Sequence, residues 1–241
     1  MQSSEGLLLF VQYAFMPNRL GYCGGNDNAL LFDHAVAGDA DPKLAPFLAR
    51  FTGAFPYLRT IAEANGIADP FDRRVVEAYW IGNGLLERVP ASLLTRSLED
   101  RFGSQLTGRV REIVLRKAPE GAKAHHFFHV VDVYRHLEPE IGLTAMDSCR
   151  VSWGRVRAVD GPRLIAERRP LELRDGRLAL GGARPEEIVH SVDGKGFTAS
   201  VGPGDWVSIH WGWACEVLDD RKLANLVRVS HQHLEVSNRT I

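Results

Sequence analysis

Two residues in separate motifs of the C-terminal part have the chemistry of metal ligands. Cys149 opens the string Cys-Arg-Val-Ser-Trp-Gly-Arg-Val, and His210 lies in residues 204–214, which read Gly-Asp-Trp-Val-Ser-Ile-His-Trp-Gly-Trp-Ala. A thiolate is a strong ligand for iron in a soft-ligand environment, and a neutral imidazole can be a second ligand or a hydrogen-bond donor. Taken singly, each residue also fits an ordinary core position. Cys149 and His210 are therefore a candidate metal-binding pair.

A glycine-rich loop near the N-terminus supplies a second group of reactive side chains. Residues 16–27 read Met-Pro-Asn-Arg-Leu-Gly-Tyr-Cys-Gly-Gly-Asn-Asp and include Arg19 and Cys23. Glycines allow the backbone to approach a ligand closely, and an arginine can bind an anion. The alternative is a tight connection between two helices with a buried Tyr22. The sequence leaves both interpretations open.

Three histidines follow in the short segment His-His-Phe-Phe-His. His125 and His129 are four residues apart, so on a helix they would share one face, which is a spacing that metal ligands use. A metalloprotease would need a glutamate directly after the first histidine, where this chain has His126. The competing interpretation is an aromatic-rich helix that packs on a second domain.

Composition limits the classes of function. The chain has 241 residues, 45% of them hydrophobic, which is sufficient for a folded core. The formal charge of -1 provides no basic excess for nucleic acid or anionic lipid, so we expect protein or small-ligand partners. The first residues lack the basic segment of a signal peptide, and their apolar run is too short to span a membrane. We expect a cytoplasmic protein without a disulfide framework, because its three cysteines are widely spaced.

The elements that must position these residues change in type near residues 141–143. Before this point, apolar residues recur at three- and four-residue steps, which predicts helices. The clearest sets are Leu44, Phe47, Leu48 and Phe51, then Val75, Val76, Tyr79 and Trp80, then Leu93, Leu94 and Leu98. We therefore predict a mostly helical domain over residues 1–143.

After this point, short alternating stretches separated by Asp-Gly and Gly-Gly turns predict strands. They cover residues 150–159, 163–167, 177–180, 187–192, 197–201 and 206–210. Six short strands favour a small β-barrel, and Asp219 and Asp220 are suited to begin a last helix. The predicted fold class is α+β, with residues 144–241 forming a β-barrel and a C-terminal helix.

Strand alternation also predicts which side chains share a face with His210. If it continues past residue 210, one face carries the small residues Gly212 and Ala214 beside His210, and leaves room for a ligand. The opposite face would carry Trp211, Trp213 and Cys215. We therefore expect Cys215 to be a structural core residue.

The paired motifs resemble the HypC/HupF family of hydrogenase maturation chaperones over about residues 149–235. That family begins with a cysteine, a short apolar run, a glycine and a valine, and forms a small OB-like β-barrel. It also has a Gly-Asp-Trp/Tyr-Val-x-Val-His-x-Gly-Phe-Ala strand followed by an acidic-capped helix. Here the cysteine is internal, and Trp153 replaces the family's proline before the motif glycine. The N-terminal part resembles only an uncharacterised bacterial family, which implies no activity.

The resemblance implies a non-enzymatic role in metallocofactor assembly. HypC proteins bind the scaffold protein HypD, hold iron that carries cyanide and carbon monoxide, and deliver it to the hydrogenase large-subunit precursor. The family's functional cysteine and histidine correspond to Cys149 and His210. A hydrophobic surface at Val151, Trp153, Gly154 and Trp211 would recognise the partner.

Two alternatives stay open at this point. The first is an enzyme whose site lies in the helical domain, formed by Arg19, Cys23 and the segment from His125 to His129, with the barrel as a docking module. The second is a barrel that has kept the fold for binding but lost iron chemistry, which would make the chain a pure interaction protein.

Overall fold

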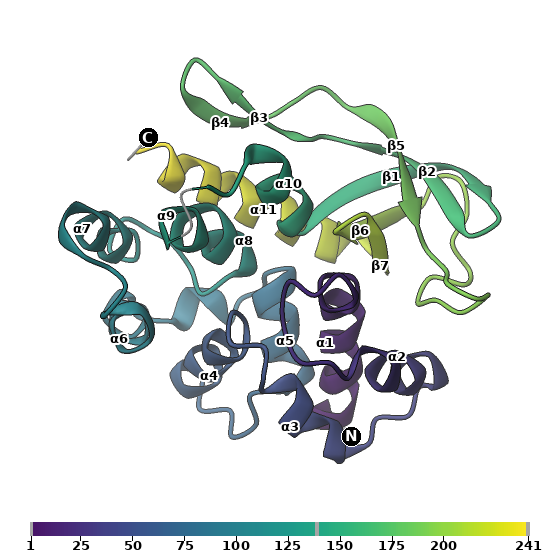
Figure 1. Ribbon diagram of the computed structural model, residues 1–241, viewed down its shortest axis with the longest axis horizontal. Coiled ribbons are helices and arrows are strands. Elements are labelled where there is room, and N and C mark those ends of the chain that lie inside the picture. Colours follow the sequence, from purple (N-terminus) through teal and green to yellow (C-terminus); the bar gives the residue numbers. More distant parts are fainter. Residues whose placement is uncertain (1, 138–139, 240–241) are drawn as a thin grey trace.

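The computed structural model describes residues 2–137 and 140–239, and it combines a helical part with a sheet part, as the sequence predicted (Figure 1). The helices are α1 (Gln2–Arg19), α2 (Asn28–Ala37), α3 (Ala45–Leu48), α4 (Phe55–Ala64), α5 (Arg73–Trp80), α6 (Ala91–Phe102), α7 (Gly108–Arg116), α8 (His126–Phe128), α9 (Arg135–Leu137), α10 (Leu143–Cys149) and α11 (Asp220–Ser237). Short 3-10 turns occur at η1 (Pro42–Leu44) and η2 (Leu86–Arg88), and a π-helical segment, η3, spans His129–Tyr134. The strands are β1 (Ser152–Asp160), β2 (Arg163–Arg168), β3 (Leu171–Arg174), β4 (Arg177–Leu180), β5 (Arg184–Val189), β6 (Trp206–His210) and β7 (Trp213–Leu218).

Helix α5 illustrates how the apolar spacing of the N-terminal part produces its packing. The Asp72 side chain accepts a hydrogen bond from the Arg74 amide and begins the helix, and the predicted stripe that includes Tyr79 and Trp80 is buried. Burying each large apolar side chain stabilises the fold by about 1.5–3 kcal/mol. The stripe is therefore sufficient to fix α5 in the core.

Helices α1 and α5 place an aromatic layer next to the strands. Helix α1 contacts α2 and α5 and also β6 and β7. Its Phe10 and Tyr13 rings pack on Trp80, with centroids 5.7 and 5.4 Å apart. The same buried cluster extends to Trp213 on β7 and Val229 on α11. The two parts thus share a core, and the predicted boundary at residue 143 coincides with the start of α10.

The strands pair in the order β1–β2–β5–β7–β6, and β6 returns to β1, so these strands form a ring of pairings. Neighbouring strands are antiparallel except β5 and β7, which share one parallel residue pair, Val189 with Trp213. A buried cluster that includes Val156, Leu164 and Ile209 connects these strands. Strands β3 and β4 form a separate hairpin.

Strand prediction was right at β1, β2, β4, β5 and β6, but wrong at residues 197–201, which form no strand. Phe197 instead leaves the sheet to pack against Phe32 and Trp213, with ring centroids 5.5 and 5.7 Å away. Strands β3 and β7 were not predicted. The loss of Phe197 from the sheet shows that aromatic packing outweighed the local alternating pattern.

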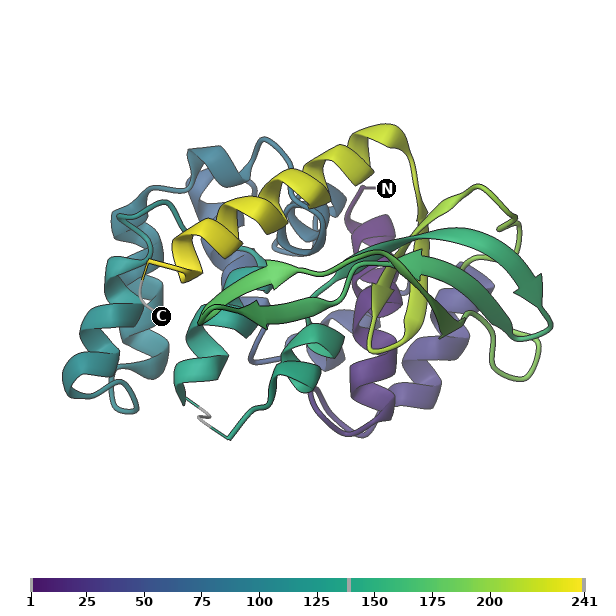
Figure 2. The same ribbon diagram turned by 90° about the horizontal axis from the view of Figure 1, so that it is seen from above.

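The C-terminal helix connects the two parts. Asp219 accepts a hydrogen bond from the Lys222 amide at 2.7 Å and caps α11, as its acidic character predicted. Figure 2 shows α11 running from the strands to the helical part, and it contacts α8, β1, β4 and β7. Among the described residues, no helix has both the length and the apolar character that crossing a bilayer requires.

Candidate metal centre

The side chains of His126, Cys149 and His210 converge at the junction of the two parts, and we call them the donor cluster. One ligand atom from each lies within 4.8 Å of the other two. The two Nε2 atoms of His126 and His210 are 3.3 Å apart, and the Cys149 Sγ is 3.9 Å from His126 Nε2. His126 begins α8, Cys149 ends α10 and His210 ends β6. Segments far apart in the chain therefore build one candidate metal centre.

His126 is fixed by the helical part. Its Nδ1 is 3.0 Å from the Tyr79 hydroxyl, and its Nε2 is 2.8 Å from the Cys149 carbonyl oxygen. Its ring also packs on Trp80 of α5, with centroids 4.6 Å apart. The short helix α8 passes directly into the π-helical segment η3, a rare conformation that is frequent at functional sites.

His210 is fixed by the backbone of α1. Its Nδ1–H donates to the Tyr13 carbonyl oxygen at 2.7 Å, and its ring is 1% exposed. Because Nδ1 carries this proton, the Nε2 of the neutral ring is left with a lone pair that faces His126. A backbone carbonyl behind a histidine is the usual outer partner of a metal-bound imidazole.

Cys149 is positioned by a network of buried charges on either side of it. Asp147 accepts hydrogen bonds from the Arg150 and Arg168 side chains, both at 2.9 Å, and from the Leu171 amide at 2.7 Å. Burial acts to raise the pKa of Asp147, but the two arginines outweigh it, so the pKa is lowered. The charged network holds the end of α10 against β2 and β3 and thereby orients the thiol.

The electrostatics of the donor cluster favour neutral groups. Burial lowers the pKa of His126 well below its ordinary value and that of His210 to about 4, and it raises the pKa of the Cys149 thiol to about 12. The cluster contains no carboxylate. Neutral imidazoles keep their lone pairs at pH 7, so the cluster can accept a thiophilic metal ion that displaces the thiol proton.

The other histidines of the segment lie outside the donor cluster. His125 accepts a hydrogen bond from the Phe127 amide at 3.1 Å and stacks on His233 at 5.5 Å. His129 Nδ1 lies 3.4 Å from the Tyr57 hydroxyl. The expected pairing of His125 with His129 requires both residues to lie on one helix, but His125 is the N-cap residue of α8 and has an extended backbone, with φ of -128° and ψ of 150°. The middle histidine, His126, is the one that meets Cys149 and His210.

The glycine-rich loop lies beside the donor cluster. Tyr22, which the structural alternative placed in the core, is 63% exposed and stacks on Trp211 with centroids 4.3 Å apart. Asn18 donates to the carbonyl oxygens of Cys23 and Gly25, both at 2.7 Å, and holds the loop closed. Burial raises the pKa of Cys23 to about 12, and the neighbouring Cys149 adds to this effect. The loop surrounds a polar hollow of about 290 Å³, lined by Asn18, Arg19, Gly21, Cys23, Gly24, Gly25, Asn26 and Asn28.

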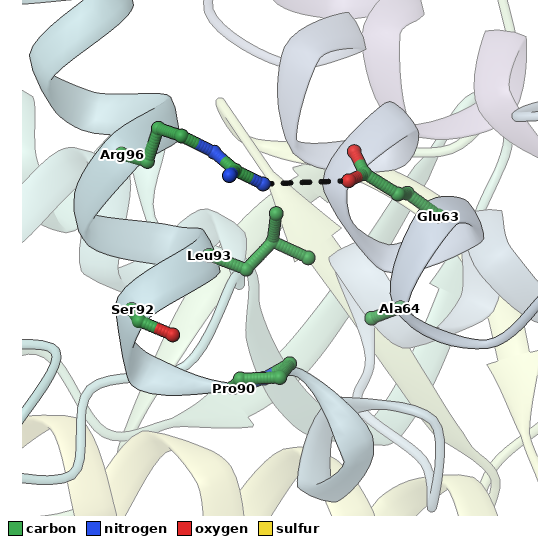
Figure 3. A pocket seen from close by; sticks show the side chains of 6 residues that line it. All are labelled: Glu63, Ala64, Pro90, Ser92, Leu93 and Arg96. Atoms are coloured by element: carbon green, nitrogen blue, oxygen red, sulfur yellow. Dashed lines mark ion pairs between the residues drawn. The ribbon is translucent and has the colours of Figure 1, made fainter.

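A second hollow of about 330 Å³ lies between α4 and α6, away from the donor cluster (Figure 3). Figure 3 shows its Arg96 and Glu63 side chains directed toward each other, 3.5 Å apart. None of its lining residues, Glu63, Ala64, Pro90, Ser92, Leu93 and Arg96, is a histidine or a cysteine. This hollow therefore offers no soft metal ligand.

The residues expected to form a partner surface differ in exposure. Val151 is 1% exposed and Gly154 is buried, where a Cβ atom would lie 3.0 Å from Ile209. Trp153 and Trp211 are partly exposed. Cys215 is fully buried in the shared core. Of these residues, the two tryptophans are available to a partner in the isolated chain.

The expected alternation beyond His210 is wrong, because β6 ends there and Trp211 and Gly212 form a two-residue turn into β7. Both have left-handed backbone angles, with φ of 53° and 68°, as in a type I′ hairpin turn. Sequence analysis also missed Tyr79 and Tyr13 as partners of the two histidines. Tyr79 was assigned to the core because of its apolar stripe, and Tyr13 acts through its carbonyl, which no sequence pattern identifies.

Comparison with known proteins identifies a family to which the chain is similar. A family described as a family of unknown function, DUF6390, matches residues 2–241 and so covers both the helical part and the strands. No curated protein and no solved structure matches the chain. Because the family model extends over residues 2–241, the chain belongs to the DUF6390 family.

Proposed function

We propose that this protein is a metallocofactor assembly chaperone of the hydrogenase maturation type. It binds iron that carries cyanide and carbon monoxide through Cys149 and His210, and escorts it toward a nickel-iron hydrogenase large subunit. One observation carries the proposal: the cysteine and the histidine that the HypC-like motifs select lie in the same donor cluster. The ring of strand pairings and the capped helix α11 are compatible with a HypC-like (OB-like) barrel.

The exposure of the residues in the donor cluster suits an iron fragment that must enter and leave the site. His126 and His210 are buried, at 6% and 1% exposed, whereas Cys149 is partly exposed. An iron fragment with its own diatomic ligands can approach the sulfur and still leave coordination positions open. Few protein ligands favour release, which a carrier requires.

The thiol holds its proton until a metal arrives. Because burial raises the pKa of Cys149 to about 12, the free protein carries almost no thiolate at pH 7. Metal binding then releases one proton from the sulfur. This property protects the empty carrier from oxidation and alkylation, which act on the thiolate.

An aromatic surface next to the thiol supports a role in partner recognition. Trp211 stacks on the exposed Tyr22, and its backbone amide donates to the Ser148 carbonyl at 2.8 Å, one residue before Cys149. Exposed aromatic residues are frequent anchors at protein interfaces. We propose that a HypD-like scaffold and the large-subunit precursor dock at Trp153 and Trp211.

The test is anaerobic co-purification of the wild type and Cys149→Ala from a host that expresses the maturation machinery. We expect iron together with infrared bands in the cyanide and carbonyl stretching region in the wild type, and neither in Cys149→Ala. Cys215→Ala is the matched control, because it removes a buried thiol that lies outside the donor cluster. A wild type that binds its partners without iron or these bands would contradict the carrier function.

The polar hollow beside Arg19 and Cys23 favours a second candidate, an enzyme with its site on the helical side and the barrel as a docking module. Cationic and thiol groups at a concave surface are common in ligand sites. This candidate predicts an activity that survives Cys149→Ala and is lost in Arg19→Ala.

A further inference from the structure

The two ring nitrogens of His126 have partners of different kinds. Nε2 faces two acceptors, the Cys149 carbonyl oxygen at 2.8 Å and the Nε2 of His210 at 3.3 Å. Nδ1 faces the Tyr79 hydroxyl at 3.0 Å. The same hydroxyl lies 3.2 Å from the Gly53 carbonyl oxygen. Tyr79 therefore has two acceptors available for its single proton.

These contacts fix the tautomers of the metal-free state. A carbonyl only accepts, so His210 carries its proton on Nδ1, toward Tyr13, and has a lone pair on Nε2. His126 must then carry its proton on Nε2. A lone pair on this atom would face two other acceptors, His210 Nε2 and the Cys149 oxygen, with no proton between them. The Nδ1 of His126 is consequently bare and accepts the Tyr79 proton.

We propose that His126 is a third metal ligand beside Cys149 and His210, and that Tyr79 is the positioning residue that allows His126 to change tautomer when a divalent transition-metal ion binds. In the bound state the His126 proton resides on Nδ1 and is donated to the Tyr79 oxygen. The Tyr79 proton turns to the Gly53 carbonyl. The Cys149 thiol releases one proton to solvent, so the binding step is balanced.

The distances fit this assignment. A tetrahedral ion with bonds of 2.0–2.1 Å to nitrogen and 2.3 Å to sulfur separates two nitrogens by about 3.3 Å and a nitrogen from a sulfur by about 3.6 Å. The His126–His210 separation is 3.3 Å, and the Cys149–His126 separation is 3.9 Å. The Cys149 and His210 donor atoms lie within 4.8 Å of each other, so closure around an ion needs the Cys149 side chain to move toward His210 by up to about 1 Å. A fourth position remains for an exogenous ligand.

Tyr79 is suited to this role because its hydroxyl lies within hydrogen-bond distance of both His126 Nδ1 and the Gly53 carbonyl oxygen. Its ring stacks on Tyr57 at 5.6 Å and packs edge-on to Trp80 at 4.7 Å, which holds the hydroxyl between His126 and Gly53. A metal-bound histidine normally donates its other N–H to such a partner, and loss of the partner weakens metal binding by 10–100-fold.

The inference rests on the proposed function for the use of Cys149 and His210 as ligands, but it requires no partner and no iron fragment. It also gives the helical part a role in the site. His126 is the donor that connects this part to the barrel motifs. The metal centre then forms only when both parts are docked.

The experiment is anaerobic titration of the full chain with Co²⁺, followed by absorption spectroscopy. In the wild type we expect a thiolate-to-cobalt charge-transfer band and visible bands of four-coordinate Co²⁺. His126→Ala should keep the charge-transfer band, bind at least 10-fold more weakly and lose the four-coordinate visible bands. Tyr79→Phe should bind 10–100-fold more weakly, whereas the matched control Tyr57→Phe should stay within 2-fold of the wild type, because its hydroxyl faces His129.

A second measurement needs no variant. Nitrogen NMR of the histidine rings should show His126 changing from the Nε2–H to the Nδ1–H tautomer when Zn²⁺ is added, while His210 remains Nδ1–H. If His126→Ala binds Co²⁺ like the wild type and the His126 tautomer does not change, the inference is overturned and the proposed function stands. If the wild type shows no charge-transfer band, the use of Cys149 fails, and the proposed function falls with it.

Discussion

Two buried polar clusters join the helical part to the C-terminal elements, and they differ in charge. The donor cluster joins α8 to α10 and β6 through neutral groups. The other, which we call the clamp cluster, consists of Lys117, Asp132 and Ser237, all fully buried. It joins the residue after α7 and the π-helical segment to the end of α11. The two clusters thus bring two different kinds of chemistry to the junction.

The charged groups of the clamp cluster pair with each other and with the backbone of α11. Lys117 Nζ lies 3.2 Å from an Asp132 oxygen and donates to the Val236 carbonyl at 2.7 Å, and the Ser237 hydroxyl donates to the other Asp132 oxygen at 2.7 Å. Burial lowers the pKa of Lys117, and Asp132 opposes this effect. The donor cluster has no opposite charge, and one potential ligand atom from each of its residues lies within 4.8 Å of the other two. The comparison indicates a structural role for the clamp cluster and is consistent with the metal-binding role proposed for the donor cluster.

The largest expected loss of stability follows from a substitution in the clamp cluster. Lys117→Met leaves the Asp132 carboxylate buried without its cation, and we expect a loss of about 3–5 kcal/mol in the free energy of unfolding. Urea denaturation followed by circular dichroism measures it. The folded fraction should still bind Co²⁺, since Lys117 lies outside the donor cluster.

The matched control for this variant is Lys117→Met combined with Asp132→Leu. Removing both charges eliminates the uncompensated carboxylate, so the double variant should recover part of the lost stability. A single variant that costs less than about 1 kcal/mol would contradict the assignment of Lys117 and Asp132 as a structural clamp.

The second largest expected effect is a gain in stability from metal binding at the donor cluster, which should appear only when metal is present. Zn²⁺ at 100 times its dissociation constant should stabilise the wild type by about 2.7 kcal/mol, because the ion binds the folded state. Cys149→Ala should lose this gain, whereas His231→Ala, at an exposed position on α11, should keep it. Thermal unfolding with and without Zn²⁺ measures the difference. An equal gain in Cys149→Ala would assign the ion to another site.

The sequence identified Cys149 and His210 because each lies in a local motif with its own spacing. It could not identify His126 as their neighbour, since the contact between His126 and His210 joins residues 84 positions apart and depends on how the two parts dock. The four-residue rule favoured His125 and His129, and this rule assumes that both residues lie on one helix, whereas His125 precedes α8 as its extended N-cap residue. A three-residue helix followed by a π-helical segment is not visible in the spacing of apolar residues.

The α+β fold class and the positions of most strands followed from apolar periodicity and Asp-Gly turns. The failures have a common cause, which is packing between distant residues. Phe197 joined an aromatic cluster instead of a strand. Tyr22 lies on the surface because Trp211, from a distant hairpin turn, provides a ring on which it stacks. Local patterns contain no information on either contact.

An ion pair between α5 and α11 is less buried than the clamp cluster and gives a smaller effect. Glu77 on α5 is 6% exposed and pairs with Arg221 of α11 at 2.8 and 3.1 Å, and the Arg221 side chain is 57% exposed. Burial acts to raise the pKa of Glu77, but Arg221 and Asn83 outweigh it, so the pKa is lowered. We expect Glu77→Gln to cost about 1–2 kcal/mol near neutral pH, because a hydrogen bond to a charged group is lost.

The pH dependence of this effect has a definite sign. The folded-state pKa of Glu77 is below that of the unfolded chain, which is about 4.3. The stability that Glu77 contributes is therefore complete above about pH 5 and is lost as the pH falls through the folded-state pKa. Urea denaturation from pH 7 to pH 3 should show the wild type and Glu77→Gln converging at acid pH. A constant difference would contradict the ion pair as its source.

The smallest expected effect on stability belongs to the turn that covers the donor cluster. Trp211 has a φ of 53°, a left-handed angle that is costly for a bulky residue, and such strain often occurs at functional positions. Its indole lies beside the Cys149 thiol. Burial raises the pKa of this thiol to about 12, and the indole acts in the opposite direction. Trp211→Asn relieves the strain, because asparagine tolerates this angle, but loses the stacking on Tyr22. The two changes oppose each other, so the free energy of unfolding should change by less than about 1 kcal/mol.

The same variant should change access to the thiol far more than it changes stability. Without the indole, Cys149 should react several-fold faster with a thiol reagent such as dithiobis-nitrobenzoate under native conditions. Tyr22→Ala is the control, because it removes the outer ring of the stack and leaves Trp211 over the sulfur. If Tyr22→Ala accelerates the reaction as much as Trp211→Asn, the loop around Cys23 limits access. If only Trp211→Asn accelerates it, the strained tryptophan itself shields the donor cluster, which explains why a costly backbone angle is kept at the end of β6.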